Sequence, residues 1–366
     1  METTKKKKGG KKALVIAGVG VGALIVAIPV VLIALVLVLA LAIHLLTPLA
    51  FPDFFGNAKE EYVTPGIYEG LVPQGYAFDE EEELFLQCGY MADGENASRI
   101  YITYSEGDNS YSDPVYVELY TADGEPYMGH TGGITSSDGF VWLANDGEGD
   151  DNCVWVLSMS DILESAKTDK KVTIDVSFQS ETRAACCFSD GEYLWIGEFN
   201  NSEEYATKDT HAFEVADGKI NKALVCAYKI DRFTETGVAY RELDGEDVLV
   251  PELALSVTDL VQGFTRTPDG FAISTSYGVS FSNVYIYEGI NEYREPDDIL
   301  DVNGYAVPVY FLDNETLTDK ITMPPMSEEI LVKDGRLYIL FESACRKYIF
   351  GNLTRGIHVY SYDLTK

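Results

Sequence analysis

The N-terminal part of the chain contains one long, uninterrupted apolar segment. Residues 13–46 hold no ionisable side chain except His44, and about 20 apolar residues are enough to cross a bilayer core. The apolar region of a secretory signal peptide is only about 7–15 residues long, so this segment is too long for a simple cleaved signal. We therefore predict a retained transmembrane helix, a signal-anchor. Cleavage at Ala40-Leu41-Ala42, where small residues have cleavage spacing, is the alternative.

The residues on either side of this segment indicate its orientation. Six lysines within residues 1–12 give this basic segment a local charge of +5. By the positive-inside rule, these lysines keep the N-terminus cytoplasmic and place the rest of the chain outside. Pro48 and Pro52 disfavour continuation of the helix, so residues 47–59 are predicted to form a short stalk. The prediction is a single-pass cell-membrane protein with an extracellular domain over residues 60–366.

From about Glu60 onward, short runs of alternating apolar and polar residues are separated by Gly, Asp and Asn. This pattern is typical of strands and tight turns. Only Ser160–Ala166 has a helical pattern, with Ser160 as its expected N-cap. Asp-Gly pairs, which supply the positive φ angles of tight hairpins, recur directly before an apolar strand. These pairs are Asp138-Gly139, Asp190-Gly191, Asp269-Gly270 and Asp334-Gly335.

The strands repeat in units of four, roughly every 50–75 residues, which is the pattern of a β-propeller. The units begin at Val72, His130, Arg183, Leu260 and Met326. The last strands of the first four units are expected at 117–120, 172–174, 238–240 and 309–311. The fifth unit has only three strands, and Tyr62–Tyr68 can supply the fourth and remove both free edges. We predict an all-β, five-bladed propeller. Six blades is the alternative, and a β-sandwich would not explain the recurring turn.

Composition narrows the classes of partner. The formal net charge is −32, and the chain after residue 12 is near −37. So acidic a domain argues against nucleic acid as a partner, because phosphate binding needs clustered Lys and Arg. It is compatible with plain solubility, and with cations or basic partners. The six cysteines form no CxxC and no Cys/His cluster, so we expect buried free thiols rather than a zinc site.

Polar residues at the start of each unit are candidates for a ligand site, because the innermost strands of a propeller line its axis. Convergent polar groups in one concavity are the default hypothesis for a binding site. The channel candidates are Gln74, His130, Thr131, Arg183, Gln262, Glu328 and Glu329. Residues that follow a second strand, where loops open onto one face, are also candidates: Glu198, Tyr277 and Glu342. The alternative is that these groups only hydrogen-bond one another and water.

The candidates allow more than one chemistry. Glu328 with Glu342 could serve as acid and base, or could bind a cation. Arg183 is the only cation among the channel positions, and an internal ion pair is favoured over a clamp on a ligand carboxylate. The chain has no G-x-S-x-G and no H-E-x-x-H motif, which lowers the case for hydrolysis. No metal site and no cofactor is assigned.

Calcium is the one cofactor that the sequence leaves open. Residues 146–152 place side-chain oxygens at alternate positions, as calcium-binding loops do. The segment lacks the twelve-residue frame and the bidentate glutamate of such a loop. We therefore predict an acidic hairpin tip at this place.

The segments that open the units resemble the innermost strands of lactonase-like and NHL-like β-propellers. More narrowly, the chain resembles a group of uncharacterised bacterial propellers that are secreted or membrane-anchored. The resembling segments are Val72–Gly75, His130–Ile134, Leu194–Phe199, Val261–Gly263, Thr275–Gly278, Met326–Glu329 and Phe341–Ser343. The resemblance implies a fold and a compartment, and no particular reaction.

Three functions remain open at this point. The leading hypothesis is a binding or scaffolding module for a cell-surface glycan, peptide or protein. The first alternative is a lactonase-like or glycan-processing enzyme that works at the mouth of the channel. The second is a structural surface protein without a pocket.

Overall fold

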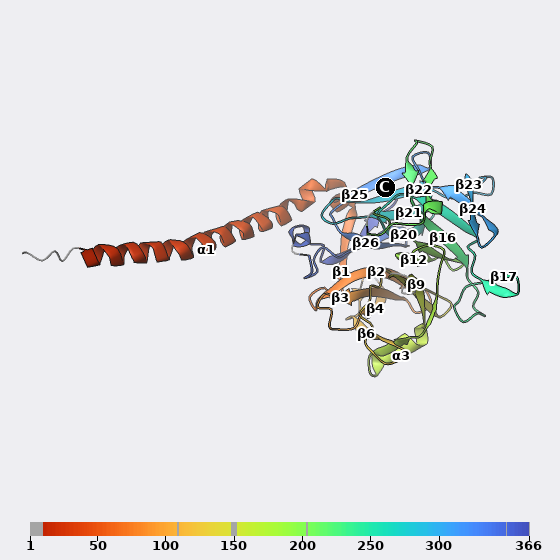
Figure 1. Cartoon of the computed structure of the whole chain (residues 1–366), viewed down its shortest axis with the longest axis horizontal. Helices are drawn as coiled ribbons and strands as arrows, with labels where there is room; N and C mark the ends of the chain where they lie inside the picture. The colour runs from red at the N-terminus through yellow and green to blue at the C-terminus, as the bar shows by residue number, and fades with distance from the viewer. Residues whose placement is uncertain (1–9, 108–109, 148–151, 203, 349, 366) are drawn as a thin grey trace, which may run out of the picture. The chain divides into compact units, whose positions relative to one another are not determined.

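The computed structural model describes most of the chain (Figure 1). The described ranges are 10–107, 110–147, 152–202, 204–348 and 350–365, with side chains from residue 27 onward. The chain divides into two compact units, a helical one that ends at Ala50 and a domain that begins at Phe51. Most of the predicted basic segment, residues 1–9, lies outside the described part.

The first unit is helix α1, Gly10–Ala50. Within it, Ala27–Ala50 is long and apolar enough to be a candidate membrane span, with a mean hydropathy of 3.0. The helix continues past the predicted end at residue 46, and Pro48 lies in its last turn. A proline there removes one N–H donor, and the Thr47 hydroxyl donates to the carbonyl of Ile43 at 2.8 Å in the same turn.

The residues expected to form a stalk are largely ordered. Helix α2, Pro52–Asn57, begins with proline at its first position, where the missing N–H costs nothing. Strand β1, Ala58–Val63, follows directly. Phe54 in α2 is fully buried and belongs to the core of the domain. The second unit therefore begins directly with regular secondary structure.

The domain is built from five blades, each a sheet of four antiparallel strands. Blade I has β2 Leu71–Asp79, β3 Leu84–Met91, β4 Arg99–Gly107 and β6 Val115–Thr121. Blade II has β7 Gly133–Ser137, β8 Phe140–Asp146, β9 Asn152–Ser158 and β11 Val176–Phe178. Blade III has β12 Cys186–Ser189, β13 Tyr193–Gly197, β16 Ala223–Lys229 and β19 Leu253–Val257. Blade IV has β20 Val261–Thr267, β21 Gly270–Thr275, β22 Ser282–Glu288 and β25 Leu317–Met323. Blade V has β26 Ser327–Lys333, β27 Arg336–Phe341, β28 His358–Asp363 and β1.

Shorter elements decorate the blades. Strand β5, Ser110–Tyr111, pairs with β4, and β10, Lys171–Ile174, adds to β6 in parallel. Strand β24, Tyr305–Phe311, adds to β19 in parallel and pairs with β23, Asp298–Val302. The remaining elements are α3 Met159–Lys167, η2 Asp209–His211, η3 Gly351–Thr354, and the hairpins β14 Phe213–Glu214 with β15 Ile220–Asn221 and β17 Arg241–Leu243 with β18 Glu246–Val248.

The five blades close into a ring. Each innermost strand contacts the next in the cycle β2, β7, β12, β20, β26 and back to β2. Every pair of neighbouring blades encloses its own apolar core, so the ring has five cores between its blades. The core between blades V and I includes Tyr76, Phe85 and Tyr338, with Tyr62 of β1 packed against it. This arrangement confirms the predicted five-bladed β-propeller.

Glycines allow the innermost strands to approach one another. A Cβ atom on Gly75 would lie 2.5 Å from the Ile134 nitrogen, and one on Gly133 would lie 2.6 Å from the Cys187 nitrogen. On Gly263 it would lie 2.8 Å from the Ile330 nitrogen. Such contacts with backbone atoms cannot be relieved by a rotamer change. Larger residues at these positions would therefore force the ring open.

The inner halves of the blades agree with the sequence prediction better than the outer halves do. The Asp138-Gly139 and Asp334-Gly335 pairs both have positive φ at each residue, as tight hairpins require. Helix α3 confirms the predicted helical piece, although its N-cap is Ser158, whose hydroxyl accepts from the Asp161 N–H, and not Ser160.

Four expected strands were placed wrongly. Residues 172–174 belong to β10 beside blade I, and residues 309–311 belong to β24 beside blade III. The segment 238–240 makes only an isolated bridge, between Ile230 and Val238. The closing strand is β1, Ala58–Val63, and not Tyr62–Tyr68. Each error exchanges an outermost strand for a nearby segment with similar alternation.

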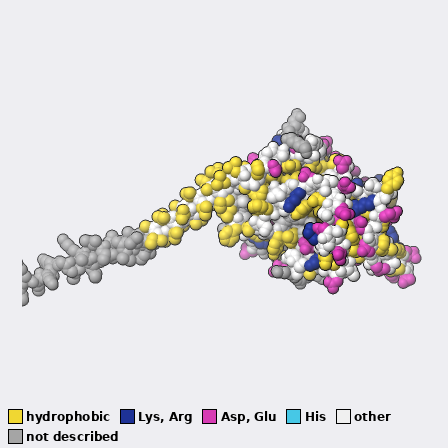
Figure 2. Space-filling view, turned by 90° about the horizontal axis from the view of Figure 1, so that it is seen from above, with side chains coloured by type: hydrophobic (Ala, Val, Ile, Leu, Met, Phe, Trp, Pro, Cys, Tyr) yellow, Lys and Arg dark blue, Asp and Glu magenta, His cyan; other side chains and the backbone are white. Residues whose placement is uncertain are grey.

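The distribution of charged side chains and the burial of the cysteines agree with the predictions made from the composition. Asp and Glu side chains are spread over the visible face of the domain, and apolar side chains cover the described part of helix α1 (Figure 2). All six cysteines are buried, and Cys88, Cys186, Cys187, Cys226 and Cys345 are free thiols. Burial raises the pKa of Cys88 to about 12, which makes its thiol unreactive at neutral pH.

We expect the closing strand to contribute measurably to the stability of the ring. The Tyr62 hydroxyl lies 2.6 Å from that of Tyr76, and its ring centroid lies 4.5 Å from that of Tyr111 and 5.9 Å from that of Phe85. Tyr62→Ala should lower the free energy of unfolding in urea by about 2 kcal/mol, because it removes a partly buried aromatic side chain between two blades. Tyr62→Phe keeps the ring and should lose about half of that. Equal stability of Tyr62→Ala and wild type would show that β1 does not hold the blades together.

Candidate functional site

A pocket of about 870 Å³ lies at one end of the propeller axis, and all five blades contribute to its wall. Its lining includes Gln74, Tyr90, Met128, His130, Asp146, Phe199, Tyr205, Gln262, Tyr277, Met326, Glu328, Glu342, Lys347, Tyr348 and Phe350. Six of the ten candidate residues predicted from the sequence are in this set: Gln74, His130, Gln262, Tyr277, Glu328 and Glu342. The ring thus brings together residues that are far apart in the sequence.

β-Bulges occur in three of the innermost strands next to the pocket. The register shifts between Pro73 and Tyr76 in β2, between Val261 and Gly263 in β20, and between Ser327 and Ile330 in β26. The shifted residues include the three pocket residues Gln74, Gln262 and Glu328. A bulge re-aims a side chain, and bulges are frequent next to active sites. The bulges explain how polar side chains of otherwise regular strands reach the pocket.

Backbone strain accompanies two of these bulges. Leu260 and Met326, each just before its bulged strand, have φ values of 66° and 67°. Such a conformation costs a non-glycine residue on the order of 1 kcal/mol. The Met326 N–H donates to the Ser276 hydroxyl at 3.1 Å, and its carbonyl accepts from the Glu342 N–H at 3.0 Å. These contacts hold Met326 in place at the pocket wall.

A chain of polar contacts crosses the floor of the pocket. His130 Nδ1 lies 3.0 Å from Asp146 Oδ1, and its Nε2 makes a short contact with Gln74 Oε1. Gln74 Nε2 in turn donates to Glu342 Oε2 at 3.1 Å. Burial alone would raise the pKa of Asp146, but His130 and Arg183 outweigh it and lower that pKa. Asp146 is therefore ionised at neutral pH.

Glu328 and Glu342 form a pair of carboxyl groups that hydrogen-bond each other on this floor. They are 2% and 8% exposed. Burial, together with the neighbouring carboxylate, holds the pKa of Glu328 well above its usual range. Burial raises the pKa of Glu342 to about 7, although its contacts with Glu328, His130 and Lys347 oppose this. Two carboxyls this close keep one proton between them near neutral pH.

The rim of the pocket is aromatic and apolar. Tyr277 is 51% exposed and Phe350 is 74% exposed. The ammonium group of Lys347 donates to the Tyr90 hydroxyl at 2.5 Å. It also lies 4.6 Å and 5.4 Å from the ring centroids of Tyr90 and Tyr348, within the range of cation–π attraction. The rim therefore presents aromatic groups around a carboxylate floor.

Four candidates lie outside this pocket lining. Glu329 is 1% exposed, accepts a hydrogen bond from the Phe264 N–H at 3.0 Å, and has a raised pKa because of burial. Thr131 is fully buried, and its carbonyl accepts from the Cys88 thiol at 3.3 Å. The Arg183 guanidinium donates twice to the carbonyl oxygen of Asp146, at 2.8 and 3.0 Å. Arg183 thus bonds a backbone carbonyl, where the sequence predicted a pair with a channel carboxylate.

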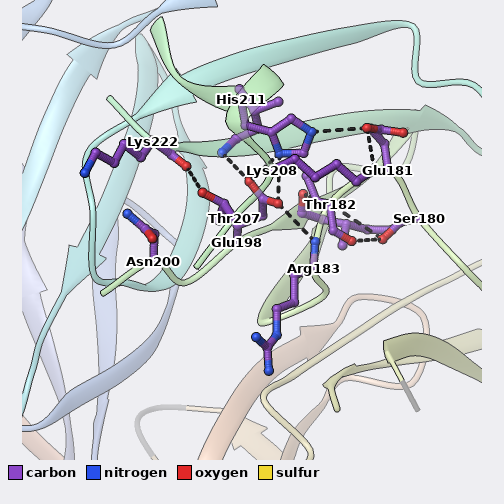
Figure 3. A network of polar contacts seen from close by, with 12 residues as sticks. Ser180, Glu181, Thr182, Arg183, Glu198, Asn200, Thr207, Lys208, His211 and Lys222 are labelled. Atoms are coloured by element: carbon purple, nitrogen blue, oxygen red, sulfur yellow. Dashed lines mark hydrogen bonds and ion pairs between the residues drawn. The ribbon is translucent and has the colours of Figure 1, made fainter. Parts of the chain in front are cut away.

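Glu198, the fourth, belongs to a separate buried cluster (Figure 3). The His211 ring is fully buried between Glu198, 3.0 Å from Nδ1, and Glu181, 3.1 Å from Nε2. Glu198 also accepts from the backbone N–H groups of Arg183 and Leu224. Burial would lower the pKa of His211, but the two carboxylates outweigh it and raise that pKa to about 9. This cluster is a structural clamp that ties the loop containing η2 to blade III.

Sequence reasoning missed Tyr90, Tyr348 and Lys347, and it considered Asp146 only as part of the segment weighed for calcium. These residues lie at strand ends or in the loop after β27, where no repeat marks them. Within the described ranges, no group of three His, Cys, Asp or Glu side chains is arranged to hold a metal ion. Residues 148–151 of the segment considered for calcium lie outside the described part.

No protein-family model and no curated protein sequence matches the chain. Among solved structures, it is similar to the Myxococcus xanthus glutaminyl cyclase at 10% identity and a TM-score of 0.36, covering 83% of this chain and 94% of that one. It is similar to the WD40 β-propeller domain of Doa1 at 12% identity and a TM-score of 0.32, covering 80% and 79%. It is similar to BamB from Moraxella catarrhalis at 9% identity and a TM-score of 0.31, covering 81% and 83%.

These structural neighbours concern the fold alone. The chain is a five-bladed β-propeller. The narrower resemblance to bacterial membrane-anchored propellers has no sequence family behind it. We draw no function from likenesses at these identities and TM-scores, so the function must be argued from the pocket itself.

The His211 clamp predicts a loss of stability in alkali. A histidine whose pKa rises from 6.5 to about 9 on folding stabilises the protein fully below pH 6.5, and this contribution is lost as pH rises through 9. The free energy of unfolding of the full chain in detergent should therefore fall by about 3 kcal/mol from this group between pH 6.5 and 9.5. His211→Gln should be less stable at pH 6.5 and lack this part of the slope, whereas His358→Gln should retain it. An identical slope in His211→Gln would contradict a charged clamp.

Proposed function

We propose that the chain is a membrane-anchored extracellular propeller that binds a cell-surface glycan, peptide or protein at its axial pocket. The observation that carries the proposal is the convergence of all five blades on one pocket with a polar floor and an aromatic rim. Its volume of about 870 Å³ is in the range of small-molecule and peptide sites. Three bulges and a strained Met326 support the proposal, because irregular backbone concentrates at binding sites.

A scaffold without a pocket agrees less well with these features. A purely structural ring would be expected to fill its axis with apolar or aromatic side chains. The floor here instead buries Glu328 and Glu342 side by side, and leaving such groups without a counter-charge costs stability. A binding role gives a reason for that cost.

Glycan processing by two carboxyl groups also agrees less well. Retaining glycosidases hold their two carboxyls about 5–5.5 Å apart, and inverting ones about 6.5–9.5 Å. Glu328 and Glu342 hydrogen-bond each other, which is closer than either arrangement allows. A lactonase-like reaction that uses a metal finds no group of three ligands in the described ranges. Binding is therefore favoured over these two reactions.

The binding role of the pocket can be tested with two variants of pocket residues and one matched surface control. We expect that glycan and peptide arrays probed with the full-length protein will identify a ligand, and that Tyr277→Ala and Gln262→Ala will each weaken it about tenfold or more. Both side chains line the pocket, and Tyr277 is half exposed, so the melting temperature should not change. Tyr293→Ala is the control, since Tyr293 is 84% exposed and is not part of the pocket lining. A ligand whose affinity survives both pocket changes would place its site elsewhere.

The proposed topology rests on helix α1 and the lysines that precede it. Protease added to intact cells should digest the domain and leave a tag at the N-terminus protected. A second tag at the C-terminus should be lost in the same experiment. Protection of the C-terminal tag in intact cells, and its loss only after permeabilisation, would contradict an extracellular domain.

A further inference from the structure

Exposure changes steeply from the floor to the rim of the axial pocket. The floor carboxyls of Glu328 and Glu342 are 2% and 8% exposed, whereas Tyr277 and Phe350 at the rim are 51% and 74% exposed. The pocket is also lined by Tyr90, Tyr205 and Tyr348, which are half-buried, and by the buried Phe199. A ligand group that reaches the carboxyls lies among several aromatic side chains, which favours a slender stem.

The floor has an excess of negative groups. Asp146 is already engaged by His130, whose Nδ1 lies 3.0 Å from Asp146 Oδ1. The ammonium of Lys347 is engaged with Tyr90 and the ring of Tyr348. Among the described residues, no Lys, Arg or His forms an ion pair with Glu328 or Glu342. The pair Glu328 and Glu342, called the dyad below, thus retains a proton and has no cationic partner among the described residues.

We propose that, if the axial pocket binds a ligand as argued above, it accepts a lysine side chain of a peptide or protein, with the ammonium group placed against Glu328 and Glu342. The four-carbon stem of lysine is slender and apolar enough to pass the aromatic walls. Its three N–H donors can bond two carboxylates and the Gln74 amide oxygen. The proton shared by the dyad leaves to solvent when the ammonium takes its place.

One lysine of this protein already lies next to the aromatic walls of the pocket. Lys347 already holds an ammonium group beside the Tyr90 hydroxyl and within cation–π range of the Tyr90 and Tyr348 rings, so aromatic residues of this pocket already accommodate a cation. A bound lysine would meet the same kind of aromatic surface on its way to the floor. Lys347 is also a positive charge that opposes a second cation nearby, so its removal should favour binding.

Other cations fit less well. Calcium needs six to eight oxygen ligands, and no group of three acidic or metal-binding side chains is assembled in the described ranges. An arginine guanidinium is a wide planar fork suited to the two oxygens of one carboxylate, whereas an ammonium is a compact charge that fits between two groups. An amino sugar carries its amine on a ring of hydroxyl groups, and these would meet aromatic walls with few polar partners.

The first experiment compares peptide probes on the full-length protein in detergent. A blocked Gly-Lys-Gly peptide should bind by calorimetry, and its Nε-acetyl-lysine and norleucine versions should bind at least tenfold more weakly, because each lacks the charge. An arginine peptide tests the guanidinium group, and a glucosamine oligomer tests the amine of an amino sugar. Equal binding of lysine and acetyl-lysine, or preference for the glucosamine oligomer, would overturn the proposal.

The second experiment uses variants and pH. Glu342→Gln keeps the size of the side chain and should weaken the lysine peptide about tenfold or more without lowering the melting temperature. Glu328→Gln should do the same if Glu342→Gln fails to fold. Lys347→Met should strengthen binding several-fold. Unchanged affinity in both glutamine variants would contradict contact between the ammonium and the dyad.

Affinity should rise between pH 6 and 8, because the dyad must release its proton to the solvent before a cation can bind. The charged or titratable groups that face the dyad are Glu329, His130, Cys345, Lys347 and Tyr348. Glu342→Gln is the variant that isolates the contribution of the dyad. A pH dependence that persists unchanged in Glu342→Gln would assign it to another group.

The two proposals fail in different ways. If the arrays find a ligand that Tyr277→Ala weakens but that contains no lysine, the pocket is a binding site and the lysine assignment is wrong. If neither arrays nor peptides bind, the binding function itself is wrong.

Discussion

Closure of the ring is the constraint on which the rest of this structure depends. Strand β1 comes from the N-terminal side of the domain and pairs with β28 from its C-terminal end, so blade V contains both ends of the domain. Without β1, the outer edge of β28 would have unpaired N–H and C=O groups, and Tyr62 would be missing from the contact between blades V and I. Closure also fixes how near the axis the five innermost strands come, which is why Gly75, Gly133 and Gly263 occur there.

The axial pocket is a consequence of that closure. Five strands that converge on one axis must place their inward side chains together, whatever their separation in the sequence. Bulges in β2, β20 and β26 then turn Gln74, Gln262 and Glu328 into the opening. Most of the fold obeys local rules of strand and turn. Several exceptions gather near this end of the axis: the bulges in β2, β20 and β26, the positive φ at Leu260 and Met326, and the buried Glu328 and Glu342.

The sequence predicts the inner strands of each blade well and the outermost strands poorly, and the reason is physical. The inner strands are largely buried, and in four of the five blades an Asp-Gly pair follows the innermost strand, so their pattern is strong. Outer strands are largely exposed: in β25 only Ile321 and Met323 are buried, so β24 with its stronger alternation was mistaken for it. The same difference explains which residues of the site could be predicted. Gln74, Gln262 and Glu328 follow from their places in inner strands, whereas Tyr90, Lys347 and Tyr348 depend on how a strand end and a loop after β27 fold back.

Two pairs of carboxyl groups in this domain, one partly buried and one buried, are stabilised in opposite ways. Between Glu181 and Glu198 the chain places His211, a cation that contacts both carboxylates, and Lys208 pairs with Glu181 as a second cation. Between Glu328 and Glu342 it places no cation that pairs with them among the described residues, and the pair retains a proton instead. Since the fold can recruit a histidine where a partly buried pair holds a loop in place, the axial pair is not explained by structural need. The axial pair opens into a pocket, where a counter-charge from outside the chain can reach it.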